Sequence, residues 1–222
     1  MKKYAYLMLS TLMLLSGQAL AQKQEWNFQV YLNDQKIGHH SFLVEADEGL
    51  ERVISEASYD VKFLFVTAYT YRHTSLETWR NNCLVSIQSQ TDDNGTKQYI
   101  SGQLQTKAQP QLLRLSTHDG NNEVSGCVKS FSYWNPTAVL DANRLLNSQT
   151  GEYVDIESEF VGSEAYKFGN KSIDSKHYRL SMEGYTIDLW YAADNDRWVG
   201  LESTTKSGAV IKYRLEESGE QL

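Results

Sequence analysis

The chain has 222 residues, a formal net charge of −7 at pH 7 and 41% hydrophobic residues. An acidic surface argues against nucleic acid or an anionic membrane surface as the main partner. The length is sufficient for one domain with a sizeable hydrophobic core.

The first 21 residues have the three parts of a cleavable secretion signal. Lys2 and Lys3 provide a basic start, residues 4–15 are almost wholly apolar, and residues 19–21 (Ala-Leu-Ala) match a small-x-small cleavage pattern. The apolar run is too short to cross ~30 Å of hydrocarbon as a permanent helix, which disfavours a retained membrane anchor. Residue 22, the first after the predicted cleavage point, is glutamine, whereas a lipid-modified protein would have cysteine there. We predict export, cleavage after Ala21 and a mature chain without a transmembrane span.

The mature residues 22–222 have the pattern of antiparallel strands. Short alternating segments are separated by turn signals such as Asn94-Gly95, whose residues both tolerate positive φ. Residues 123–133 are expected to be extended, and the four segments between 177 and 215 to form a meander of hairpins. We predict one mainly β domain, a single curved antiparallel sheet or barrel of about ten to twelve strands. A two-layer sandwich is the alternative.

One segment departs from the β pattern. Asn135 is suited to cap a helix, and Pro136 is suited to its first turn. The apolar residues that then fall on one helical face are Ala138, Val139, Ala142, Leu145 and Leu146. We predict a single helix from Thr137 to Asn147 that plugs or covers one side of the sheet.

The mature chain has two cysteines, Cys83 and Cys127. In an oxidising compartment a small, even number of cysteines favours a disulfide. Such a bond would contribute roughly 3–4 kcal/mol in the chain-entropy model. The alternative is a pair of buried free thiols. A redox-active pair is disfavoured because it would be closely spaced, as in Cys-x-x-Cys.

The segment 69–79 contains the first candidate ligand-binding residues. Side chains two apart on a strand share a face, so Tyr71, His73, Glu77 and Trp79 are expected to lie together. They either line a cavity or form a hydrogen-bonded polar group among core aromatics. His73 and Glu77 are about 13 Å apart along a strand, so they can share a ligand but not a direct contact.

Further candidates lie in the second half of the chain. Trp134 and Trp190 either line an apolar pocket or fill the core. Asp188 and Glu202 are expected on neighbouring strands, as a general acid and base or as polar cross-strand partners. Trp134, Asp188 and Trp190 complete the set of predicted ligand-binding residues.

The five histidines and the known motifs favour no metal or cofactor. His39 and His40 are adjacent, so on a strand they point to opposite faces. A zinc site needs three or four converging ligands, and the sequence has no His-x-His or His-x-x-x-His spacing. His118 and His177 are predicted to be surface residues. The Gly-x-Ser-x-Gly, Gly-x-Gly-x-x-Gly and phosphate-binding Gly-Lys-Ser/Thr motifs are absent.

Several phrases of the sequence carry a family resemblance. They are Tyr133-Trp134-Asn135-Pro136, Leu145-Leu146-Asn147-Ser148-Gln149-Thr150-Gly151-Glu152, Asp188-Leu189-Trp190-Tyr191 and Trp198-Val199-Gly200-Leu201-Glu202-Ser203. With them the chain resembles a family of exported proteobacterial proteins of unknown function. More distantly it is similar to periplasmic proteins with curved antiparallel sheets, including half-barrels that carry lipoproteins. The resemblance implies a fold and a periplasmic location, and it implies no reaction.

Three functions are compatible with these observations. The first is a periplasmic binding or carrier module for an apolar, lipid-like ligand on the concave face of the sheet. The second is an envelope assembly or interaction protein with a filled core. The third is an enzyme that uses His73, Glu77 or Asp188.

Overall fold

The computed structural model describes residues 22–63, 66–107, 111–168, 171–204 and 208–216. The predicted signal peptide lies outside these residues. Within them, the chain forms fifteen strands and one short helix. In chain order they are β1 Gln22–Leu32, β2 Gln35–Asp47, β3 Leu50–Phe63, β4 Val66–Arg80, β5 Cys83–Asp93, β6 Thr96–Gln105, β7 Leu112–Thr117, β8 Gly120–Ser125, α1 Pro136–Leu140, β9 Arg144–Leu146, β10 Tyr153–Asp155, β11 Glu157–Phe168, β12 Lys171–Met182, β13 Tyr185–Ala192, β14 Trp198–Thr204 and β15 Val210–Leu215.

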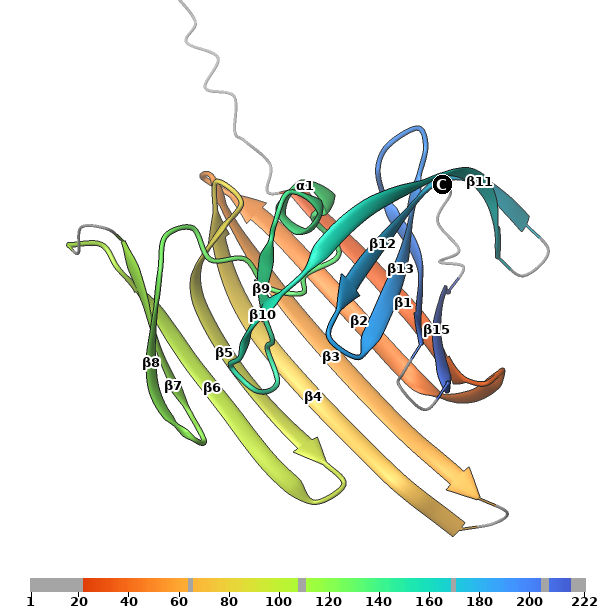
Figure 1. Cartoon of the computed structure of the whole chain (residues 1–222), viewed down its shortest axis with the longest axis horizontal. Coiled ribbons are helices and arrows are strands. Elements are labelled where there is room, and N and C mark those ends of the chain that lie inside the picture. Colours follow the sequence, from red (N-terminus) through yellow and green to blue (C-terminus); the bar gives the residue numbers. More distant parts are fainter. Residues whose placement is uncertain (1–21, 64–65, 108–110, 169–170, 205–207, 217–222) are drawn as a thin grey trace, which may run out of the picture.

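Thirteen of these strands form one antiparallel sheet in the order β11-β12-β13-β14-β15-β1-β2-β3-β4-β5-β6-β7-β8. Within β1–β8 and within β11–β15, strands that are consecutive in the chain pair with one another. The first and last strands, β1 and β15, pair near the middle of the sheet, with Val30 opposite Tyr213. The sheet curves strongly but is open, because the described parts of β8 and β11 each have one strand neighbour (Figure 1). The predicted curved antiparallel sheet is confirmed, with more strands in it than expected.

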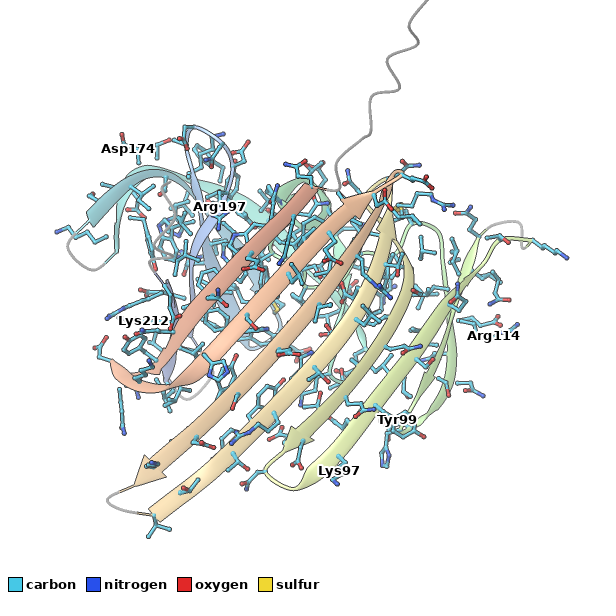
Figure 2. The ribbon with its side chains drawn as sticks, turned by 180° about the vertical axis from the view of Figure 1, so that it is seen from behind. Lys97, Tyr99, Arg114, Asp174, Arg197 and Lys212 are labelled. Atoms are coloured by element: carbon cyan, nitrogen blue, oxygen red, sulfur yellow. A yellow bond between two sulfur atoms is a disulfide. The ribbon has the colours of Figure 1, made fainter. Side chains whose placement is uncertain are left out.

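Alternation along the strands gives the sheet an apolar inner face and a polar outer face. The largest fully buried side chains lie on the inner face and come from both halves of the chain, among them Trp26, Phe28, Trp79 and Trp198. Burying a large apolar side chain contributes about 1.5–3 kcal/mol, so this face stabilises the curvature. Figure 2 shows the opposite, outer side of the sheet, where Tyr99 and Lys97 lie near one end of β6.

The connection between β8 and β11 crosses the concave face of the sheet (Figure 1). We call residues 127–156 the inner segment; it contains α1 and the small two-stranded sheet of β9 and β10. Its side chains that join the main core are Val128, Ala138, Val139, Leu145, Leu146 and Ile156. A segment of the chain itself therefore fills much of the concave face, as the expected covering helix was predicted to do.

The predicted extent of the helix was wrong. The helix is Pro136–Leu140, with Asn135 as its N-cap accepting a hydrogen bond from the Ala138 N–H at 3.0 Å. Beyond it the backbone bonds to neighbouring segments: the Leu146 N–H donates to the Lys129 carbonyl at 2.7 Å. Leu145 and Leu146 are both fully buried on a short strand, so the tertiary contacts satisfied the apolar pattern without a helix.

The predicted extended segment 123–133 was also too long. Strand β8 ends at Ser125, and Gly126 has a φ of +87°, a left-handed conformation that glycine adopts readily. Cys127 follows at once and is bonded to Cys83 at the start of β5. The predicted disulfide is confirmed, and it holds the beginning of the inner segment to the sheet. Among the described residues, no helix has the length and apolarity to span a membrane.

Candidate functional site

Two of the predicted residues, Tyr71 and His73, belong to a continuous group of aromatic side chains on the concave face. The group also contains His40, Tyr59 and Tyr213, and we call these five residues the tyrosine–histidine band. His73 is 6% exposed, and the other four are half-buried, so part of the band is accessible. The candidate site is therefore an aromatic surface on the inner side of the sheet.

Strand register places these side chains beside one another. His40 and His73 lie opposite Ala57 on its two sides, and the small alanine leaves room for both rings. In the next row, Tyr59 is opposite Tyr71, and their rings stack with centroids 5.2 Å apart and an interplanar angle of 10°. Such pairs contribute about 0.5–1.5 kcal/mol beyond the area that they bury.

Hydrogen bonds join the band across distant parts of the chain. The hydroxyl groups of Tyr59 and Tyr213 are 2.7 Å apart, and Nδ1 of His40 lies 3.0 Å from the Tyr213 hydroxyl. Nε2 of His40 lies 2.7 Å from Oγ of Ser55. On β4, Nδ1 of His73 lies 2.8 Å from Oγ1 of Thr91. Hydrogen bonds thus connect His40, Tyr59 and Tyr213, and ring stacking joins Tyr71 and His73 to them.

One turn of the inner segment, residues 147–151, rests on the band. The Tyr71 hydroxyl donates to Oε1 of Gln149 at 3.1 Å, and Nε2 of Gln149 donates to Oδ2 of Asp93 at 3.2 Å. Oγ of Ser89 donates to the Ser148 carbonyl at 2.6 Å. The turn is therefore attached to strands β4 and β5 by a few polar contacts.

Burial keeps the band uncharged near neutral pH. It lowers the pKa of His40 to about 3, with the charge of His73 as a smaller cause, and it lowers the pKa of His73 to about 4. Burial also raises the pKa of Tyr213 to about 12 and the pKa of Tyr59 well above its usual value. The band therefore offers apolar rings and neutral hydrogen-bonding groups, which suits a neutral or amphipathic ligand better than an ion.

The lowered pKa of His73 leads to a test by pH. In the unfolded chain this group titrates near 6.5, so it favours folding above that pH, and this contribution is lost as the pH falls towards about 4. We expect the free energy of unfolding of the wild-type protein to fall by about 3 kcal/mol over that range because of His73. The measurement is urea unfolding at several pH values for wild type and His73→Gln.

The His73→Gln variant should show a shallower loss of stability on acidification than wild type. His118→Gln is the matched control, since His118 is exposed on the surface as predicted. Parallel curves for wild type and His73→Gln between pH 6.5 and 4 would contradict a neutral, buried His73.

Glu77, Trp79 and Trp134 lie deeper and form a different group. The Glu77 carboxylate accepts hydrogen bonds from Nε1 of Trp79 at 2.9 Å and from Oγ of Ser132 at 2.7 Å. Oγ of Ser130 donates to it at 3.0 Å. Burial raises the pKa of Glu77, against the opposing effect of these hydrogen bonds. This carboxylate fastens the inner segment to β4, as the alternative of a hydrogen-bonded group among core aromatics predicted.

Trp134 contacts this group from the inner segment. Its ring is perpendicular to that of Trp79, with centroids 6.0 Å apart. Its Nε1 atom is buried and has no hydrogen-bond partner among the described residues. Trp79 and Trp134 therefore pack in or against the core, at a different place from the tyrosine–histidine band.

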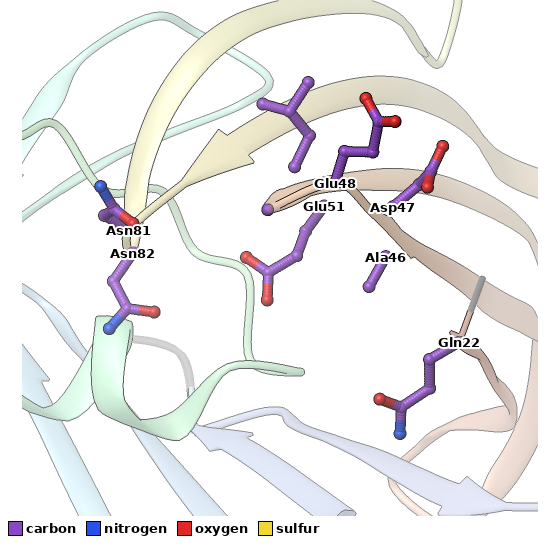
Figure 3. A pocket seen from close by; sticks show the side chains of 9 residues that line it. Gln22, Ala46, Asp47, Glu48, Glu51, Asn81 and Asn82 are labelled. Atoms are coloured by element: carbon purple, nitrogen blue, oxygen red, sulfur yellow. The ribbon is translucent and has the colours of Figure 1, made fainter. Parts of the chain in front are cut away.

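A hollow of about 430 Å³ lies at one end of the sheet, where the sequence indicated no site (Figure 3). Three carboxylates line it, Asp47, Glu48 and Glu51, together with the amides of Asn81 and Asn82. Burial raises the pKa of Glu51. Among the described residues, no group of three or more histidine, cysteine, aspartate or glutamate side chains has an arrangement that could hold a metal ion.

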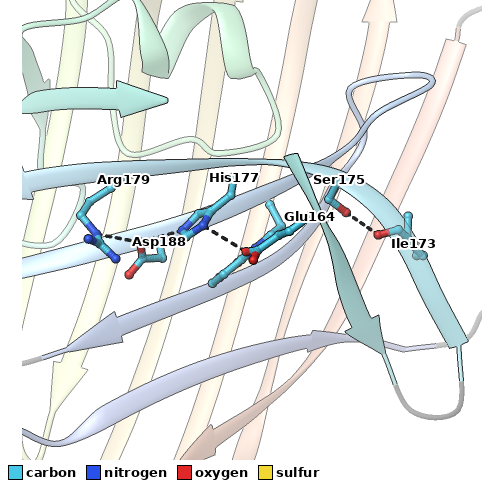
Figure 4. A network of polar contacts seen from close by, with 7 residues as sticks. Glu164, Ile173, Ser175, His177, Arg179 and Asp188 are labelled. Carbon is cyan, nitrogen blue, oxygen red and sulfur yellow. Dashed lines mark hydrogen bonds and ion pairs between the residues drawn. The ribbon is translucent and has the colours of Figure 1, made fainter. Parts of the chain in front are cut away.

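Asp188 and Trp190 lie on the outer face, in a polar network with His177 (Figure 4). Oδ1 of Asp188 lies 2.8 Å from Nε2 of His177 and accepts from Nε of Arg179 at 2.8 Å. Nδ1 of His177 lies 3.1 Å from Oε1 of Glu164, which also accepts from Nε1 of Trp190 at 2.7 Å.

The surface position predicted for His177 was wrong, since this residue is only 8% exposed. Its ring stacks on Trp190 with centroids 4.5 Å apart, and Glu164 of β11 lies within hydrogen-bond distance of a ring nitrogen of each residue. Asp188 is opposite Glu202 on β14, so the expected adjacency is confirmed. Its partners are His177 and Arg179, which makes this a cross-strand polar network.

The predicted site residues therefore fall in three places. Tyr71 and His73 lie in the band, Glu77, Trp79 and Trp134 in the core, and Asp188 and Trp190 on the outer face. The sequence interpretation missed Tyr59 and Tyr213 as band residues. Alternation predicts which neighbours share a face with Tyr59, but the pairing of β1 with β15 that brings in Tyr213 has no local signal.

The open, curved antiparallel sheet, with a segment of its own chain packed against the concave face, defines a barrel-like β protein. The chain belongs to the family DUF6134, a domain of unknown function, which matches residues 28–216. The expected membership of a family of unknown function is thereby confirmed.

The fold has a counterpart among solved structures. The chain is similar to the crystal structure of a beta-barrel-like protein of the domain of unknown function DUF1849 from Brucella abortus, with a TM-score of 0.59 and 9% identity. The match covers 89% of this chain and 97% of that chain. At this identity the similarity concerns the fold alone. No curated protein matches the sequence.

Proposed function

We propose that this protein is a periplasmic binding or carrier module for a lipid-like ligand, which it holds on the tyrosine–histidine band. The observation that carries the proposal is the band itself: accessible aromatic rings on a concave face, joined to neutral hydrogen-bonding groups. Rings of this kind bind apolar chains, and the tyrosine hydroxyls and imidazoles can bind a neutral polar end.

The inner segment limits how the ligand would lie. It packs against much of the concave face, so an apolar chain would lie along Tyr59 and Tyr213 rather than in an enclosed tunnel. Movement of the turn 147–151 would widen access to Tyr71 and His73, because Gln149 and Ser148 of this turn contact their side chains. The proposed ligand is therefore amphipathic.

The periplasmic location is part of the proposal. The basic, apolar and small-residue parts of residues 1–21 support export. The Cys83–Cys127 bond supports an oxidising compartment, since disulfides of this kind are rare in the reducing cytosol.

The test is lipid analysis of protein purified from the periplasm, by native mass spectrometry and by organic extraction. We expect a stoichiometric amphipathic lipid on wild type and roughly tenfold weaker rebinding to Tyr59→Ala, because one large aromatic contact is lost. Tyr99→Ala, which removes a tyrosine from the outer face, is the matched control and should bind as wild type. The proposal is contradicted if the wild-type protein carries no lipid and extracted lipids do not rebind to it.

A second candidate function is an envelope assembly or interaction protein. The buried residues of the inner segment favour it, because they occupy space that a carrier would otherwise leave for a ligand. In that case the wild-type protein carries no lipid, and the Tyr59→Ala variant changes stability without changing lipid content. His73, Glu77 and Asp188 lie in the three separate groups described above, so an enzyme that uses one of them would not use all three together.

A further inference from the structure

The outer face of the sheet has a shallow groove that the proposed function does not use. Two adjoining hollows, of about 700 and about 570 Å³, lie over strands β2 to β6. Both are lined by Thr74, Gln90 and Tyr99, so they form one continuous surface, which we call the outer groove. Figure 2 shows this side of the molecule, with Tyr99 labelled.

The strand register orders the groove into two rows. Glu56, Thr74, Gln90 and Tyr99 are successive partners across β3, β4, β5 and β6. Ile54, Leu76, Gln88 and Ser101 form the next row in the same way. With strands about 4.8 Å apart, each row spans roughly 14 Å, and the two rows are roughly 7 Å apart.

The chemistry of these rows is unusual for a plain solvent-exposed face. Tyr99 is 52% exposed, and the perpendicular ring of His118 lies 6.2 Å from it. Ile54 and Leu76 are partly buried and supply an apolar floor.

Three of the polar side chains that line the groove are free to bind, whereas Arg72 and Asp92 are hydrogen-bonded within the protein. The side chains of Glu56, Gln88 and Gln90 make no hydrogen bond and no ion pair with other described residues. Amide and carboxylate groups are planar and have two adjacent positions for hydrogen bonds. The groove therefore combines an exposed aromatic ring, aliphatic contacts and three unpaired planar polar groups.

We propose that the outer groove binds an uncharged, extended oligosaccharide that lies across the strands. A sugar ring has a C–H face that packs on an aromatic or aliphatic side chain, and neighbouring hydroxyls that match the two ends of an amide or carboxylate. Two to three sugar rings fit the roughly 14 Å of each row.

Other classes of ligand fit this groove less well. An extended peptide gains most of its affinity from backbone pairing at a sheet edge, and β3 to β5 are paired on both sides. An acyl chain binds best where apolar side chains line the site, whereas polar side chains line most of this groove. The net charge of −7 disfavours a polyanion.

The experiment is titration of the intact mature protein with a panel of neutral linear oligosaccharides, namely cello-, malto- and chito-oligosaccharides, by calorimetry and by NMR of the tyrosine rings. We expect at least one series to bind, with affinity that increases with chain length up to three sugar rings. Tyr99→Ala and Gln90→Ala should each weaken binding about tenfold or more, the loss typical of one central contact.

Phe160→Ala is the matched control, because Phe160 is a similarly exposed aromatic residue, 55% exposed, on β11. It should bind as wild type, and so should Tyr59→Ala on the concave face. Thermal melts identify any variant that is unfolded, and the Tyr99 ring resonances report contact in the wild type without substitution. The proposal is overturned if no member of the panel binds, or if Tyr99→Ala binds as tightly as wild type.

Discussion

Replacement of both cysteines, Cys83→Ser with Cys127→Ser, is expected to lower the free energy of unfolding by about 3–4 kcal/mol. The bond closes a loop with a sequence separation of 44 residues, so its loss raises the conformational entropy of the unfolded chain. It also holds the start of the inner segment beside β5, where the Leu84 N–H donates to the Val128 carbonyl at 2.8 Å. The measurement is urea unfolding of wild type and the double variant.

Wild-type protein in the presence of a reductant is the control for this substitution, and it should unfold at nearly the same urea concentration as the double variant. Hydrogen exchange should locate the change, with faster exchange in residues 127–132 than in β13 and β14. A loss below about 1 kcal/mol would show that the disulfide is not needed to hold the inner segment on the sheet.

Glu77→Ala is the second substitution expected to have a large effect. It should lower the free energy of unfolding by about 3 kcal/mol or more. The substitution removes the acceptor for Nε1 of Trp79 and for the hydroxyls of Ser130 and Ser132, and each buried donor left unpaired costs about 1–3 kcal/mol. The two serine hydroxyls are 2.9 Å apart and can still pair with one another, which limits the loss. Urea unfolding measures the change, with Glu51→Ala as a partly exposed carboxylate control.

The pH dependence of Glu77 has the opposite sign to that of His73. Burial raises the pKa of Glu77 above 4.5. Its contribution to folding stability is therefore fully present below pH 4.5 and is lost as the pH rises through the folded-state pKa. Glu77→Gln keeps an acceptor oxygen and removes the charge. Relative to Glu77→Gln, wild type should therefore become less stable as the pH rises, and a constant difference between them would contradict a raised pKa.

The residues of β4 show how far local sequence pattern could lead. Alternation placed Tyr71, His73, Glu77 and Trp79 on one face, and the structure has them there. Their environments differ because the inner segment covers only part of that face: it surrounds Glu77 with Ser130 and places Ser148 over His73. The pattern could not indicate this division, since it depends on contacts between residues far apart in the chain.

The helix shows the opposite case, in which tertiary packing overrode local preference. The cap at Asn135 was correctly indicated, because capping depends on residues a few positions apart. The end of the helix was not, because Leu145 and Leu146 gain more from burial against the sheet than from continued helical hydrogen bonds.

The sequence by itself determined the features that depend on short-range chemistry. These are the antiparallel β class, most hairpin turns, the faces of β4 and the presence of two cysteines suited to pairing. The tertiary structure alone decided that Tyr213 joins Tyr59 and His40, and that Asp188 lies on the outer face in contact with His177. The reason is that strand alternation repeats every two residues, whereas the pairing of β1 with β15 and the course of residues 127–156 are set by burial summed over the whole sheet.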